Sequence, residues 1–112
     1  RVIVNLGYGT GPDVAMRLER NNIICNYQAT PEEEGFTASG ALRMGVNEMT
    51  RFGFGPAEFD QLAQIMADCI LRGKEVKEDV MKLRAGCTEM KYCFNDDQAA
   101  GALSELARKT GI

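Results

Sequence analysis

The chain of 112 residues contains no histidine and no tryptophan, and none of its four cysteines forms a C-x-x-C pair. Without histidine, neither a Ser-His-Asp nor a Cys-His nucleophile arrangement can be assembled from these residues. The spacing of Cys25, Cys69, Cys87 and Cys93 also lacks the sulfur and imidazole pattern of a zinc site. The sequence therefore predicts no metal site, and it favours thiols that stay reduced, as is typical of the cytoplasm.

An excess of positive charge and a long apolar run are absent as well. The net charge of −3 argues against nucleic-acid binding, which requires a basic face. No apolar run approaches the roughly 20 residues that cross a bilayer, so we expect no membrane partner. The chain also lacks an initiator methionine, and residues 1–5 resemble a strand rather than a leader peptide. We therefore expect a piece of a longer polypeptide, of the size of one small domain.

The pattern of apolar residues predicts an α+β fold. Strands are expected at residues 2–6, 23–28 and 37–46, and helices at 12–20, 56–72, 75–84 and about 96–111, with one short turn of helix within 47–55. Residues 90–94 read as a short strand or an extended tail. The short connection before the third strand favours antiparallel pairing, so we expect a small antiparallel sheet of about three strands covered by helices. We predict a domain of residues 1–94 and a helical tail of residues 95–112.

Two other motifs are better explained by structure than by chemistry. The glycines of residues 7–11 invite comparison with a phosphate-binding loop. Their spacing, however, matches neither the dinucleotide-binding motif nor the nucleotide-binding P-loop, so a structural turn is favoured. The acidic residues 32–34 read as a solvated loop tip, and the other paired carboxylates lie in stretches expected to be exposed. The residues alone therefore predict no catalytic group and no cofactor-binding residue in this segment.

One arginine in the third predicted strand is the best candidate for a binding residue. Arg43 stands between Leu42 and Met44 in an apolar run, where a buried guanidinium is costly unless an anion meets it. The planar fork of arginine binds a carboxylate through two parallel hydrogen bonds. We therefore expect Arg43 to bind a substrate carboxylate. The alternative is a strand residue whose charged head reaches solvent or pairs with a nearby glutamate.

Several motifs, in collinear order, resemble serine hydroxymethyltransferases. The family pattern SG(I/L)R(I/L)G followed by TPA and TTRGF is similar to SGALRMG at residues 39–45 and MTRFGF at 49–54. The strand IICNYQ at 23–28 resembles the family's GI-x-x-N-x-N, and EVKEDV at 75–80 resembles its E-V-R-x-x-V. Residues 59–70 are similar to its D/E-F-x-x-I-A-x-x-I helix. The resemblance covers about residues 1–94.

The resemblance implies that this segment is the small C-terminal domain of a fold-type I enzyme that uses pyridoxal 5'-phosphate. The matching arginine, Arg43, would bind the α-carboxylate of the amino-acid substrate. The cofactor would be bound mainly by a large N-terminal domain outside this chain, so the segment alone is expected to be inactive. The parent enzyme would interconvert serine and glycine, pass a one-carbon unit to tetrahydrofolate, and form a homodimer or larger homo-oligomer.

The sequence departs from the family pattern next to the arginine. Residues 46–48 read VNE where the family has Thr-Pro-Ala, and residues 51–53 read RFG where it has Thr-Arg-Gly. These changes keep two alternatives open. One is a related pyridoxal-phosphate aldolase or transaldolase, and the other is a non-catalytic α+β interaction module.

Overall fold

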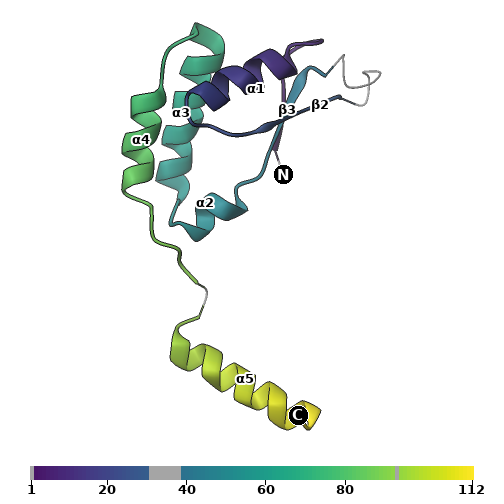
Figure 1. Cartoon of the computed structure of the whole chain (residues 1–112), viewed down its shortest axis with the longest axis vertical. Coiled ribbons are helices and arrows are strands. Elements are labelled where there is room, and N and C mark those ends of the chain that lie inside the picture. The colour runs from purple at the N-terminus through teal and green to yellow at the C-terminus, as the bar shows by residue number, and fades with distance from the viewer. Residues whose placement is uncertain (1, 31–38, 93) are drawn as a thin grey trace.

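The computed structural model describes residues 2–30, 39–92 and 94–112, and in these ranges it is a three-stranded sheet with five helices. The strands β1 (Val2–Asn5), β2 (Asn26–Gln28) and β3 (Ala41–Met44) are antiparallel in the order β1-β3-β2. The helices are α1 (Gly11–Arg20), α2 (Asn47–Arg51), α3 (Pro56–Arg72), α4 (Lys77–Ala85) and α5 (Asp96–Thr110) (Figure 1). The predicted α+β fold with a small antiparallel sheet is confirmed.

The core lies between the sheet and the helices α1 and α3. Helix α1 has a short apolar face because residues 14, 15 and 18 recur at helical spacing, and this face is buried. Leu42 of β3 is fully buried against it, and Val4 of β1 packs alongside. The buried cluster consists of Val14, Ala15, Leu18, Leu42, Met66, Cys69 and Val76.

Gly11 allows α1 to start directly against the sheet. Its amide N–H donates to the Ser39 carbonyl oxygen at 2.9 Å. A Cβ at this position would lie 2.8 Å from that oxygen and 3.0 Å from the Tyr27 Cβ. Only glycine therefore fits without displacing backbone, and the first turn of α1 is anchored to the residues just before β3.

Two strands are shorter than predicted, each for a local reason. β2 begins at Asn26 rather than at residue 23, because the Ile23 N–H donates to the Leu18 carbonyl oxygen and stays with the end of α1. β3 ends at Met44, because Val46 already caps α2. It begins at Ala41, and residues 37 and 38 of the predicted strand lie outside the described residues.

The predicted helices have nearly the observed limits. α3 spans the predicted range, and Gly73 ends it in the left-handed conformation with φ of 62°. α4 starts at Lys77 rather than residue 75, after Val76, whose N–H is bonded to the side chain of Asn21. At the described positions 90–92 and 94 the structure has no strand, so the strand alternative for residues 90–94 is wrong there.

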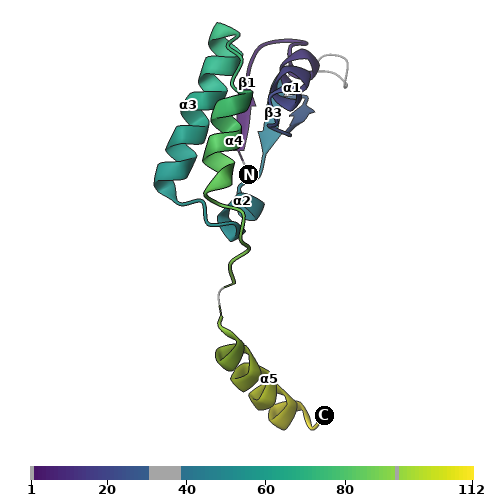
Figure 2. The same ribbon diagram turned by 60° about the vertical axis from the view of Figure 1, so that its left-hand side comes forward.

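Helix α5 extends away from the sheet and from the other helices (Figures 1 and 2). Asn95 caps it, since its side chain accepts from the Gln98 N–H at 2.8 Å while the Gln98 side chain accepts from the Asn95 N–H. Gly111 ends it in the left-handed conformation. The division of the chain at residue 94 into a domain and a tail stays a prediction. None of the helices in the described ranges is long and apolar enough to cross a membrane.

Candidate functional site

Arg43 lies on β3, the central strand of the sheet, and points away from the core. Its cross-strand partners are Ile3 on β1 and Asn26 on β2. The neighbours Leu42 and Met44 pack into the core, and successive side chains on a strand alternate between faces. Arg43 therefore belongs to the outer face of the sheet, where it is half-buried while Ile3 is 55% exposed.

The guanidinium of Arg43 has no hydrogen-bond or ion-pair partner among residues 2–30, 39–92 and 94–112. Two other cations do form ion pairs: Arg72 pairs with Asp68, and Lys109 pairs with Glu105 at 2.7 Å. The acidic residues 32–34, predicted to form a loop tip, lie outside the described residues. The described part of the fold thus brings a central-strand cation to an outer face and supplies no anion for it there.

The segment after α4 is bound to α2, close to the end of β3, and sequence reasoning missed this contact. The Lys91 N–H donates to the Arg51 carbonyl oxygen at 2.6 Å, and the Arg51 guanidinium lies 3.1 Å from the Met90 sulfur. The Arg84 guanidinium stacks 4.5 Å from the centre of the Phe52 ring. These contacts join residues 32 to 40 positions apart, and no local pattern in the sequence indicates them.

The glycine-rich turn between β1 and α1 is accounted for by its own hydrogen bonds. Gly7 and Gly9 have φ of 111° and 73°, a region that glycine enters without strain. The Gly7 N–H donates to the Asn5 side chain at 3.2 Å, and the Thr10 hydroxyl donates to the Gly7 carbonyl oxygen at 2.8 Å. This arrangement agrees with the preferred interpretation as a structural turn, and it requires no bound phosphate.

Among the described residues, the titratable groups with shifted pKa values are two thiols, one half-buried and one in the core. Burial raises the pKa of the Cys25 thiol, and it also raises that of Cys69, whose residue is fully buried in the core. A raised thiol pKa lowers the fraction of reactive thiolate, so neither cysteine has the character of a nucleophile. Within the described ranges, no group of three or more Cys, Asp or Glu side chains is arranged to bind a metal ion.

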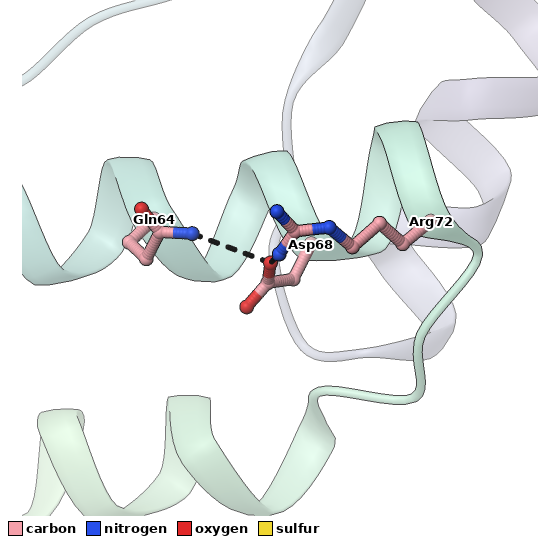
Figure 3. Close-up of polar contacts among 3 residues, drawn as sticks. All are labelled: Gln64, Asp68 and Arg72. Atoms are coloured by element: carbon pink, nitrogen blue, oxygen red, sulfur yellow. Dashed lines mark hydrogen bonds and ion pairs between the residues drawn. The ribbon is translucent and has the colours of Figure 1, made fainter.

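An open groove of about 480 Å³ lies between α3 and α4, away from Arg43. Asp68 faces it, but its carboxylate is engaged by neighbours one turn before and one turn after it on α3 (Figure 3). Gln64 Nε2 donates to Asp68 Oδ1 at 3.3 Å, and Arg72 forms the ion pair. The residues that line the groove are two glutamines, four charged residues of both signs and two aliphatic residues: Gln61, Gln64, Ile65, Asp68, Lys74, Asp79, Lys82 and Leu83.

The fold and this strand arginine define a small α+β domain with helices on one sheet face and a cation on the other. No family model matches the chain. It is, however, homologous to part of the serine hydroxymethyltransferases, as the sequence motifs indicated.

Three relatives, each named serine hydroxymethyltransferase, give the extent of this homology. The relative from Pyrobaculum calidifontis is 42% identical over 90 residues, which is 78% of this chain and 21% of the relative. The one from Pyrobaculum aerophilum is 39% identical over 94 residues, or 81% and 22%. The one from Methanopyrus kandleri is 36% identical over 105 residues, or 88% and 24%. The chain therefore spans less than a quarter of the length of these relatives.

Proposed function

We propose that this chain is the small C-terminal domain of a serine hydroxymethyltransferase-like enzyme, and that Arg43 binds the α-carboxylate of its amino-acid substrate. The observation that carries the proposal is the position of Arg43, half-buried on the central strand without an anionic partner among the described residues. Burial of an unpaired guanidinium is unfavourable, so a substrate carboxylate that pairs with Arg43 would stabilise the domain. The relatives' name supports serine and glycine as the substrates.

Arg43 would act by positioning the substrate. Two parallel hydrogen bonds from the guanidinium to a carboxylate fix both the position and the plane of that carboxylate. The ammonium group of a lysine would not fix the plane. A fixed orientation determines which bond at the α-carbon is aligned for reaction in the rest of the active site. That remainder would come from the part of the enzyme outside this chain, which makes up more than three quarters of each relative's length.

Pyridoxal 5'-phosphate, the cofactor implied by the family, does not fit the described residues of this chain. The cofactor's aldehyde requires a lysine amine of lowered pKa, which burial produces. The described lysines, however, are all exposed: Lys74, Lys77, Lys82, Lys91 and Lys109. In the proposed enzyme a large N-terminal domain holds the cofactor and tetrahydrofolate is the one-carbon acceptor. We place this enzyme in the cytoplasm as a homo-oligomer.

The test uses the complete enzyme with Arg43→Ala and Arg43→Lys. Loss of a buried, hydrogen-bonded charge contact costs about 2–5 kcal/mol, so glycine should bind about 30- to 5,000-fold more weakly to the alanine variant. The Arg43→Lys variant should bind glycine more tightly than Arg43→Ala but more weakly than wild type, because lysine lacks the planar guanidinium fork. Arg72→Ala is the matched control, since Arg72 is exposed on α3 and should leave glycine binding unchanged. Glycine affinity of Arg43→Ala within twofold of wild type would refute the role of Arg43.

The two alternatives have separate tests. The residues VNE at 46–48, which form the start of α2 directly after β3, favour comparison with a pyridoxal-phosphate aldolase or transaldolase. Serine cleavage that proceeds equally well without tetrahydrofolate would support this second activity. A coding sequence that opens directly before Arg1, with no large domain, would instead favour a non-catalytic interaction module.

A further inference from the structure

The side chain of Asn26 lies beside that of Arg43 on the outer face of the sheet. Asn26 on β2 is the cross-strand partner of Arg43 on β3. Its two sequence neighbours belong to the inner face: Cys25 packs against the core cluster, and the Cβ of Tyr27 lies close to Gly11 at the start of α1. Because side chains alternate along a strand, Asn26 points outward. Residues directly opposite one another on antiparallel strands have Cβ atoms about 4.5–5.5 Å apart, so the two side chains are within reach of each other.

The amide of Asn26 is not used by the fold. In the part of the chain that the structure describes, neither this amide nor the guanidinium of Arg43 has a hydrogen-bond partner. Asn21 shows the contrast, because its Nδ2 donates to one backbone carbonyl and its Oδ1 accepts from a distant backbone N–H. Asn26 is exposed, so its carboxamide can turn toward the arginine by a rotation about side-chain bonds.

An arginine that binds a carboxylate needs a further acceptor beside its stem. The guanidinium has five N–H donors, and two parallel hydrogen bonds to a carboxylate use two of them. When the two terminal nitrogens hold the carboxylate, the Nε–H is the free donor that lies nearest the backbone. The long side chain also has considerable rotamer freedom to lose on binding. An acceptor close to the sheet would satisfy the Nε–H and hold the side chain in one orientation.

Asn26 is the best-placed acceptor among the outer-face neighbours on the described strands. Ile3, the partner of the arginine on β1, has no polar side-chain atom. Asn5 lies one pair further along the sheet, and its Oδ1 already accepts from a backbone N–H at 3.2 Å. Gln28 also lies one pair further along and is therefore diagonal to the arginine.

We propose that Asn26 is a positioning residue of the carboxylate site: its Oδ1 accepts a hydrogen bond from the Arg43 guanidinium and holds it in the orientation that binds the substrate. The inference rests on the proposed function, because it concerns the same arginine. Asn26 acts through Arg43, since its short side chain stays near the sheet while the guanidinium extends beyond it. An amide carries no charge, so it orients the guanidinium without neutralising it, and the positive charge stays available to the carboxylate.

The test measures glycine affinity of the complete enzyme. Asn26→Ala should bind glycine about five- to tenfold more weakly than wild type, because one hydrogen bond to a charged group is lost. In the Arg43→Ala background the same substitution should have no effect, since the amide then has no guanidinium to orient. Gln28→Ala is the matched control on the same strand and face, and its glycine affinity should match that of wild type. The Tm of Asn26→Ala should also be unchanged, which separates positioning from a role in folding.

Asn26→Asp tests whether the acceptor must be neutral. This change keeps the shape of the side chain, but an ionised carboxylate opposite Arg43 would pair with the guanidinium and compete with the substrate. Glycine binding should therefore fall further than in Asn26→Ala. Asn22→Asp adds the same charge at an exposed position at the end of α1 and should leave glycine affinity unchanged.

The outcomes separate this inference from the proposed function. If Arg43→Ala binds glycine as wild type does, the proposed function fails, and this inference fails with it. If Arg43→Ala weakens binding but Asn26→Ala does not, only the positioning role is wrong. Equal weakening by Asn26→Ala with and without the guanidinium also overturns the inference, because Asn26 would then act independently of Arg43. So does an Asn26→Asp variant that binds glycine more tightly than Asn26→Ala.

Discussion

Replacing Asn21 by alanine should destabilise the domain far more than a typical asparagine substitution. Asn21 is only 1% exposed and joins three elements at the end of α1. Its Nδ2 donates to the Arg17 carbonyl oxygen at 2.9 Å, and its Oδ1 accepts from the Val76 N–H at 2.8 Å. Its Nδ2 also lies 3.8 Å from the Cys69 sulfur. One side chain thus holds the start of α4 and the middle of the core in place.

The magnitude follows from what alanine leaves behind. A neutral hydrogen bond contributes about 0.5–1.5 kcal/mol to stability, and a buried donor left without a partner costs about 1–3 kcal/mol. Val76 is 1% exposed, so water cannot replace the Asn21 oxygen at its N–H. Loss of both bonds should therefore lower the free energy of unfolding by about 2–4 kcal/mol. For 112 residues this corresponds to a decrease in Tm of about 8–17 °C.

Thermal and urea unfolding of the whole chain, followed by circular dichroism, measure this effect. Asn26→Ala is the matched control, because Asn26 is exposed on β2 and should change stability by less than about 0.5 kcal/mol. The variant Asn21→Asp keeps an acceptor for Val76 but loses the donor to Arg17 and buries a charge, so it should also be destabilising. If Asn21→Ala unfolds within about 0.5 kcal/mol of wild type, the assignment of this residue as a structural link is wrong.

Three further predictions concern the core, the glycines and the thiols. Leu18→Ala should lower the free energy of unfolding by about 2–5 kcal/mol in urea titrations, since Leu18 is fully buried in the core cluster. Gly11→Ala should lower the free energy of unfolding by about 1–3 kcal/mol in the same assay, because the added Cβ would collide with backbone atoms. Gly101→Ala on α5 has open space for its Cβ, so it should instead raise the helicity measured by circular dichroism. The pKa of Cys69 is raised by burial, so the folded chain keeps a proton that the unfolded chain releases, and stability should fall as pH rises above 9.0, the ordinary thiol value. Cys69→Ala should reduce this loss of stability at alkaline pH. If Tm of this variant depends on pH as it does in wild type, the loss does not originate in Cys69.

Local sequence patterns were sufficient where hydrophobic periodicity and helix-ending residues agreed. α3 begins at Pro56 and ends before Gly73, and these limits were predicted because proline suits the first turn and glycine accepts the left-handed conformation. The antiparallel pairing of the second and third strands followed from their short connection. The identity of Arg43 as the candidate binding residue came from its charge within an apolar strand, and from the family motif around it.

Tertiary packing decided the features that depend on residues distant in sequence. Arg43 is on the outer face because its neighbours Leu42 and Met44 pack into the core that α1 and α3 complete. The helix expected at residues 12–20 ends just before Asn21, and only the approach of Val76 makes this asparagine a buried link across 55 residues. A side chain's own sequence neighbours determine its helical or extended conformation, but its burial and its partners are determined by which other elements pack against it.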